Sequence, residues 1–91
     1  MVSMEGDAGM SDSELRQLLI ELLERIAGSG GVPEQLDDQQ PLHEQIRLDS
    51  MDYLDLVIEI RKELNVQIPE SDYKSLRSLA SLVNYLGPLT R

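Results

Sequence analysis

Hydrophobic side chains recur at helical spacing in several stretches of the chain, and residues that favour helix ends bound these stretches. In the first stretch, apolar residues stand three or four positions apart and so share one helix face: Leu15, Leu18, Leu19, Leu22, Leu23 and Ile26. The preceding segment, Ser11 to Glu14, has the S-x-x-E form of a capping box. Gly28 follows as a residue able to take the left-handed conformation of a helix C-terminus. We therefore predict a helix over Asp12–Ala27.

A second amphipathic helix is predicted over Ser50–Leu64. Asp49 can accept hydrogen bonds from the first N–H groups of this helix and complements the positive end of its dipole, and Asn65 stands at its predicted end. The segment between the two helices has two prolines and no sustained period, but apolar residues are scattered along it: Val32, Leu36, Leu42, Ile46 and Leu48. A slack connection of this length is unusual in a small domain, so we expect these residues to pin it across the core, with room for a helical turn.

The C-terminal part predicts shorter elements. Ile68–Tyr73 indicates a break followed by a short helical turn, and Ser78 is placed to cap a last helix over Leu79–Leu86 that ends at Gly87-Pro88. Because no stretch alternates with period 2, the fold class is predicted to be all-α, a small three- to four-helix bundle with a long loop between the first and second helices. We expect residues 1–10 to be a disordered leader, residues 11–87 the bundle and residues 88–91 a short tail.

The helix predicted over Ser50–Leu64 has more apolar residues than one buried face requires. One set can face the core: Tyr53, Leu56, Val57, Ile60 and Leu64. A second apolar set, on another side, consists of Met51, Leu54 and Ile58, and it is interleaved with Asp52, Asp55, Glu59 and Glu63. This second set is either an ordinary solvated face packed on the long loop or a docking surface, since exposed apolar residues rimmed by charge mark interaction sites. The acidic rim would orient a basic partner.

Composition narrows the classes of function. With 8 Lys and Arg against 17 Asp and Glu, the 91-residue chain has a formal charge of −9. This charge argues against nucleic acids and anionic membrane surfaces and favours partners with basic patches. A chain of this length has one thin core and no deep cleft between domains, so we expect it not to be an enzyme. No apolar stretch approaches the roughly 20 residues of a membrane span, and we expect a monomeric, cytoplasmic protein without membrane insertion.

Two absences bear on the chemistry. Phe and Trp are missing, which predicts an aliphatic core, and Cys is missing, so any thiol chemistry must come from an attached group. The single histidine, His43, makes a poor Ser-His-Asp triad because no G-x-S-x-G elbow and no sheet are predicted. One histidine also cannot form a transition-metal site, so we predict neither catalytic nor metal-binding residues.

The start of the second predicted helix carries the most specific motif. Asp49-Ser50-Met51-Asp52 places a hydroxyl at the exposed end of a helix, with acidic residues on both sides. This stretch resembles the D-S-[LM] signature of acyl carrier proteins. The rest of the chain follows that family's layout, with a first helix, a long loop, an I-P-x-x-D turn at Ile68–Asp72 and a last helix ending in N-Y-L at residues 84–86. The resemblance covers roughly residues 11–86.

The resemblance implies that Ser50 is the attachment point of 4′-phosphopantetheine, transferred from coenzyme A by a separate Mg²⁺-dependent phosphopantetheinyl transferase. A helix N-terminus favours the negative charge of a phosphodiester, and the thiol of the arm would supply what a chain without cysteine lacks. Asp49 then belongs to the cofactor-binding site. The expected partner-docking residues are Met51, Asp52, Leu54, Asp55, Ile58 and Glu59. Further partners implied are a ligase that loads acyl or aminoacyl groups and downstream synthase or transferase enzymes with basic patches.

Four residues depart from the family's usual pattern. Arg47 stands where many members have glycine, and Tyr53 is bulkier than the small residue often found three positions after the serine. Arg61 and Lys62 interrupt a run that is acidic in typical fatty-acid carriers. These differences point to a specialised carrier devoted to one pathway.

The sequence therefore predicts a carrier that holds acyl or aminoacyl intermediates as thioesters in fatty acid, polyketide or related biosynthesis. The cargo, whether fatty acyl, polyketide, aminoacyl or D-alanyl, stays open. The alternative is an unmodified acidic helical adaptor that binds a basic or amphipathic partner helix. The adaptor hypothesis explains the charge and the second apolar set, but it gives no reason for Asp49-Ser50 at that helix start.

Overall fold

The computed structural model of the chain describes residues 10–28 and 30–90, and this part contains four α-helices, one 3-10 helix and no strand. The elements, in chain order, are α1 (Asp12–Ala27), α2 (Leu42–Gln45), α3 (Ser50–Leu64), η1 (Glu70–Ser75) and α4 (Leu79–Leu89). The predicted all-α class is confirmed, as are the bounds of the first and second predicted helices. The expected leader falls mostly outside the described residues, and Met10, its last residue, packs partly buried against the core.

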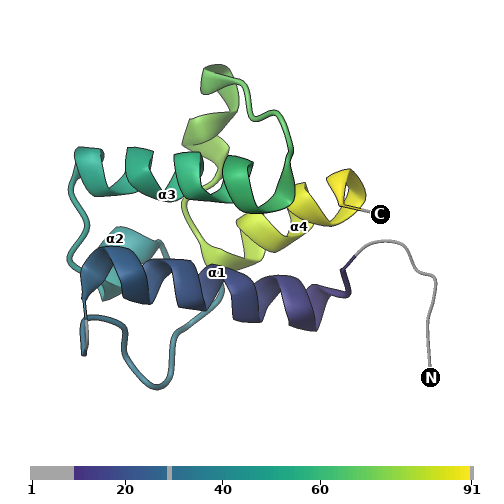
Figure 1. Cartoon of the computed structure of the whole chain (residues 1–91). Coiled ribbons are helices and arrows are strands. Elements are labelled where there is room, and N and C mark those ends of the chain that lie inside the picture. Colours follow the sequence, from purple (N-terminus) through teal and green to yellow (C-terminus); the bar gives the residue numbers. More distant parts are fainter. Residues whose placement is uncertain (1–9, 29, 91) are drawn as a thin grey trace.

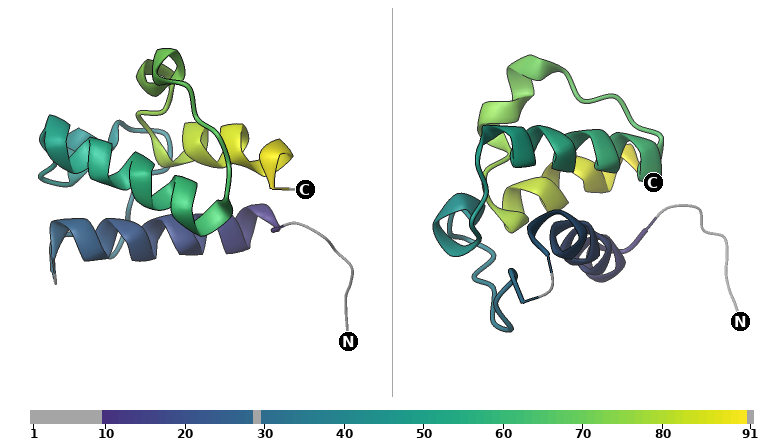
Figure 2. Two further views of the ribbon diagram at one scale, coloured as in Figure 1. Left: turned by 45° about the horizontal axis from the view of Figure 1, so that its top comes forward. Right: turned by 60° about the vertical axis from the view of Figure 1, so that its left-hand side comes forward.

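Helix α1 packs against both α3 and α4. Figures 1 and 2 show these three helices lying side by side, with α3 and α4 running opposite to α1. The start of α3 lies at the left end of the molecule in Figure 1, away from the end of α4, and η1 lies above the middle of α3. The bundle therefore presents the first turn of α3 at one end.

The core is aliphatic, as predicted. All of its buried side chains are Leu, Ile or Val, and no polar or charged side chain of the described residues is buried. Tyr53 and Leu64 are partly buried against this core, while Leu56, Val57 and Ile60 lie within it. The predicted core-facing set of α3 is thereby confirmed.

Side chains cap the three longer helices. The Ser11 hydroxyl accepts a hydrogen bond from the Glu14 N–H at 3.1 Å, and Glu14 Oε1 accepts one from the Ser11 N–H at 3.0 Å, which lowers the pKa of the Glu14 carboxyl. The same reciprocal arrangement joins Ser78 and Ser81 at the start of α4. These caps satisfy N–H groups that have no partner within the helix.

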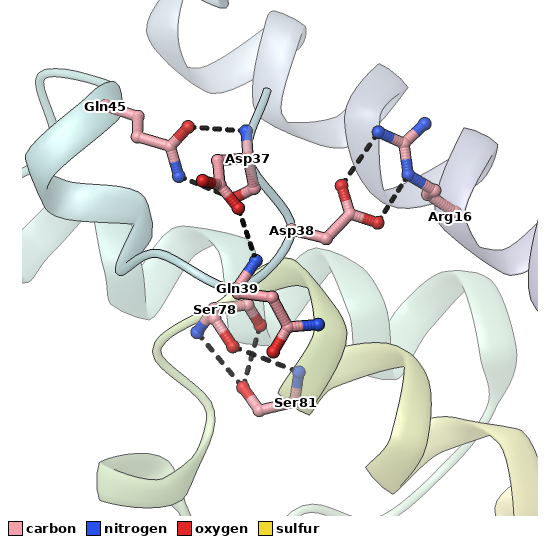
Figure 3. Close-up of polar contacts among 7 residues, drawn as sticks. All are labelled: Arg16, Asp37, Asp38, Gln39, Gln45, Ser78 and Ser81. Carbon is pink, nitrogen blue, oxygen red and sulfur yellow. Dashed lines mark hydrogen bonds and ion pairs between the residues drawn. The ribbon is translucent and has the colours of Figure 1, made fainter. Parts of the chain in front are cut away.

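The long connection between α1 and α3 is fixed in place, as Figure 3 shows. Arg16 of α1 binds both carboxylate oxygens of Asp38, through Nε at 2.8 Å and Nη2 at 2.9 Å. Gln45 of α2 accepts from the Asp37 N–H and donates to the Asp37 carbonyl, each at 2.7 Å. Together with the buried Leu36, Leu42 and Ile46, these bonds confirm that apolar residues pin the loop.

The loop also pairs with the segment that leads into α4. The Leu42 N–H donates to the Arg77 carbonyl at 2.7 Å, and the Ala80 N–H donates to the Asp38 carbonyl at 2.9 Å. An isolated antiparallel bridge joins Pro41 and Ser78. The loop before α3 and the residues around Arg77 are thus held next to each other.

The predicted end of the last helix at Gly87-Pro88 is wrong, because α4 continues to Leu89. Proline lacks an N–H and so removes one hydrogen bond of the last turn. The turn persists because the Thr90 N–H donates to the carbonyls of Leu86 and Gly87 at 3.0 and 3.2 Å. Two residues assigned to the tail therefore belong to α4.

The predicted left-handed helix end at Gly28 also needs correction. Gly28 has φ +90° and ψ 168°, a conformation that favours glycine but is not the left-handed helical one. Asn65, which ends α3, takes that conformation instead, with φ 54° and ψ 45°. A short polar side chain makes this conformation accessible to asparagine.

Candidate functional site

Ser50 is the first residue of α3, and its neighbour Asp49 caps the helix. Asp49 Oδ1 accepts a hydrogen bond from the Asp52 N–H at 2.9 Å, and Asp52 Oδ2 accepts one from the Asp49 N–H at 3.4 Å. The exposed hydroxyl of Ser50 makes no hydrogen bond within the described part of the chain. Ser50 is therefore not the cap of α3, and its hydroxyl is accessible at the positive end of a 15-residue helix.

A surface depression of about 560 Å³ opens beside Ser50, a size within the range of small-molecule pockets. Its apolar lining comes from Leu48, Tyr53, Leu54 and Tyr73. Its ionisable lining comes from His43 of α2, Asp49, Lys74 of η1 and Arg77. Residues of four separate segments thus surround one space next to the Ser50 hydroxyl.

Tyr53 forms the boundary between this depression and the core. Its ring lines the depression and also packs on the core residues. Its hydroxyl donates to the carbonyls of Leu76 and, at 3.3 Å, Tyr73. Burial raises the pKa of the Tyr53 phenol to about 12, although the nearby charge of Arg77 acts in the opposite direction. The phenol is therefore a neutral donor that ties α3 to η1.

The element that forms the outer wall of the depression, η1, has no buried residue of its own. A second tyrosine helps to hold it, because the Tyr85 hydroxyl of α4 donates to Asp72 Oδ2 at 2.6 Å. This hydrogen bond raises the pKa of the Tyr85 phenol. Two tyrosine hydroxyls, from α3 and α4, thus attach η1 to the bundle.

The second apolar set of α3 is exposed, as one of the two interpretations of the pattern requires. Met51 is 66% exposed, Leu54 41% and Ile58 42%. We call these three residues the apolar ridge. This exposure is what a docking surface requires, and docking through the apolar ridge stays a prediction.

The acidic residues beside the apolar ridge differ in whether a cation of the chain pairs with them. Lys62 lies 3.7 Å from Glu59, and Arg25 of α1 lies 3.3 Å from Glu63. Asp52 turns back to the cap, and Asp55 is exposed and makes no ion pair within the described residues. Cations of the chain itself therefore neutralise carboxylates in the C-terminal half of α3, whereas more negative charge is left unpaired near its N-terminus.

Sequence reasoning missed most residues of the depression. Lys74 and Arg77 were not singled out, and His43 was considered only as a member of a catalytic triad or of a metal site. The one sequence signal that could have indicated Lys74 and Arg77 is the presence of two cations within five positions after the I-P-x-x-D turn of an acidic chain. The described residues contain no cluster of three or more potential metal ligands. None of their helices combines the length and apolar character that a membrane span needs.

Comparison with known proteins identifies one family over most of the chain. The family described as "Phosphopantetheine attachment site" matches residues 13–86. The acyl carrier protein of Chlorobium luteolum is 22% identical over 77 residues, which cover 85% of this chain and 96% of that protein. The acyl carrier protein of Campylobacter curvus is 32% identical over 57 residues, covering 63% of this chain and 74% of that protein.

Two further likenesses extend across most of the chain. The mitochondrial acyl carrier protein of Saccharomyces cerevisiae is 25% identical over 82 residues, covering 88% of this chain and 66% of that protein. In fold, the chain is similar to a solution structure from Anaplasma phagocytophilum described as that of a candidate acyl carrier protein. The TM-score is 0.78 at 18% identity, over 96% of this chain and 98% of the other.

Proposed function

Because the chain belongs to the phosphopantetheine-attachment family of acyl carrier proteins, we propose that it carries its prosthetic arm on Ser50 and holds acyl or aminoacyl intermediates there as thioesters. Members of this family bear 4′-phosphopantetheine as a covalent group and act as carriers.

The observation that supports Ser50 is its unoccupied hydroxyl at the start of α3. Asp49 supplies the cap, so a serine at the next position has no structural task that its hydroxyl must fulfil. The hydroxyl is exposed and lines the depression. In the attachment reaction Ser50 Oγ would form a phosphodiester bond and lose its proton, with the nucleotide part of coenzyme A as the leaving group.

The residues around Ser50 suit such a group. The first turn of a helix of 15 residues favours a phosphodiester through its free N–H groups and its dipole. The apolar side chains of Leu48 and Leu54 line the adjacent space. When attached, the arm supplies the thiol that this chain lacks.

The apolar ridge is the surface that we assign to partner enzymes. Met51, Leu54 and Ile58 would make apolar contacts, while Asp49, Asp52, Asp55 and Glu59 would face Lys and Arg patches. The proposed partners are a phosphopantetheinyl transferase, a loading ligase and downstream synthase or transferase enzymes. Because exposed charges are screened by salt, complexes through this surface should weaken as ionic strength rises. A cytoplasmic location and a monomeric state stay predictions.

Modification in vitro tests the proposal. The full chain is incubated with coenzyme A, Mg²⁺ and a broad-specificity phosphopantetheinyl transferase, and its intact mass is measured. We expect a gain of one phosphopantetheinyl group, abolished in Ser50→Ala and retained in Ser71→Ala, which removes another exposed serine. A wild-type chain that gains no mass would contradict the proposal and favour the unmodified acidic adaptor.

A further inference from the structure

The charge of the depression beside Ser50 is opposite to that of the chain as a whole. The chain has 17 acidic residues against 8 Lys and Arg, yet the depression is lined by Lys74, Arg77 and His43 and by one carboxylate, Asp49. That carboxylate is held in the helix cap by the Asp52 N–H. The depression is thus a local cationic site on an acidic protein.

Lys74 and Arg77 differ from the cations that have a structural task. Arg16, Arg25 and Lys62 each form an ion pair with a carboxylate. Lys74 and Arg77 are exposed and form no ion pair within the described residues. Two charges in the same depression are therefore free to bind an anion.

The same depression has an apolar half. Leu48, Leu54, Tyr53 and Tyr73 line it together with the two cations. The core beneath Tyr53 is filled by side chains that are almost completely buried, and the Tyr53 hydroxyl is fixed to the carbonyls of Leu76 and Tyr73. An occupant that reaches from Ser50 therefore meets an open space with an apolar wall and a cationic wall.

We propose that the depression holds the cargo and favours an acyl group that ends in a carboxylate, with Lys74 and Arg77 binding the carboxylate and the apolar wall contacting the chain. This inference rests on the proposed attachment of the arm to Ser50. It names a class of cargo that the family alone does not specify for this chain.

The test measures the carboxyl group of a loaded cargo. The apo chain is loaded by a broad-specificity transferase with glutaryl-coenzyme A carrying ¹³C in its terminal carboxyl, and that carboxyl is titrated by NMR. The groups that can act on it are His43 of α2, Asp49 and Tyr53 at the start of α3, Tyr73 and Lys74 of η1, and Arg77. Opposite charges nearby lower a carboxyl pKa, so we expect a value about 0.5 to 1 below that of free glutaryl-coenzyme A.

A lowered pKa of the cargo carboxyl is informative because negative charges raise the pKa of a nearby carboxyl group, and most of the surface of this protein is acidic. The double variant Lys74→Gln/Arg77→Gln should abolish the lowering. The double variant Arg61→Gln/Lys62→Gln removes the same number of charges outside the depression and should leave it in place. Pentanoyl cargo, which lacks the carboxylate, should change the amide resonances of Lys74 and Arg77 less than glutaryl cargo does.

Each outcome decides between the hypotheses. A chain that takes up no arm overturns the proposed function and this inference together, and the mass spectrum shows it before any titration. A loaded chain whose cargo carboxyl titrates as in free glutaryl-coenzyme A, or is lowered equally in both double variants, overturns this inference alone. An unchanged carboxyl together with resonance changes at Lys74 and Arg77 on attachment of the bare arm would assign the two cations to the phosphodiester instead.

Discussion

Ile58 and Ile60 of α3 are two residues apart, but their side chains have different surroundings. Ile60 is 0% exposed and lies in the core, whereas Ile58 is 42% exposed on the apolar ridge. Replacing a fully buried isoleucine by alanine costs about 2–5 kcal/mol, through lost apolar burial and the cavity left behind. At Ile58 the alanine leaves no closed cavity, so we expect a loss of about 1 kcal/mol or less.

These costs are large relative to the stability of such a chain. At roughly 0.05–0.15 kcal/mol per residue, a domain of this length has a free energy of unfolding of about 5–14 kcal/mol. Ile60→Ala therefore removes a substantial share, which urea titration followed by circular dichroism measures directly. Because both variants replace the same residue type in the same helix, the difference between them reports the surroundings and not the helix propensity.

For modification of Ser50 we expect the opposite order, with the larger effect at Ile58. Ile58→Ala should lower kcat/KM for modification of Ser50 by about three- to tenfold, as loss of an exposed interface contact does. Ile60→Ala should leave kcat/KM near the wild-type value at temperatures where the variant is folded. Equal destabilisation of the two variants would refute the assignment of Ile58 to an exposed ridge, and modification of Ile58→Ala at the wild-type rate would refute docking through it.

Four further variants test the cap of α3, the hydrogen bonds of the Tyr53 hydroxyl and an ion pair of the long loop, each by urea unfolding. Asp49→Ala should destabilise the fold by about 1 kcal/mol, whereas Asp49→Asn keeps a good cap and should cost less than about 0.5 kcal/mol. The pKa of the Tyr53 phenol is about 12 in the folded chain, against an ordinary value of 10. The neutral phenol therefore stabilises the fold below pH 10, and this stabilisation is lost as the pH rises toward 12. Tyr53→Phe should remove this part of the alkaline dependence. The side chain of Arg16 lowers the pKa of the Asp38 carboxyl. The pair therefore stabilises the fold above the ordinary carboxyl pKa, and this stabilisation is lost as the pH falls. Arg16→Gln should lower the free energy of unfolding by about 1 kcal/mol or less at neutral pH and make it depend less on acidification.

The sequence was sufficient to predict those elements whose limits are set by local interactions. Helices α1 and α3 begin at capping boxes and have a clear apolar period, and both ends of each were predicted. The end of α4 was not, because Gly87-Pro88 is a strong signal for a helix end, whereas the hydrogen bonds of the Thr90 N–H carry the last turn past it. The Gly-Pro signal therefore did not determine where α4 ends.

The candidate site likewise has a part that the sequence predicts and a part that only the fold reveals. Ser50, its cap Asp49 and the apolar ridge lie within one helix, so the spacing of residues along α3 was enough to place them. The depression unites that helix with α2, η1 and Arg77, and no spacing rule connects Lys74 with Ser50 across 24 positions. Only the path of the chain over α3, which Figure 1 shows, brings these segments together.

Attachment of the prosthetic arm to Ser50 can be tested without any added enzyme on the protein isolated from its own organism. The intact mass of the chain and the masses of its proteolytic fragments are measured without any added enzyme. We expect a chain heavier than its sequence by one phosphopantetheinyl group, with the added mass in the fragment that contains Ser50. An isolated chain whose Ser50 fragment has only the mass of its amino acids would show that Ser50 does not bear the arm.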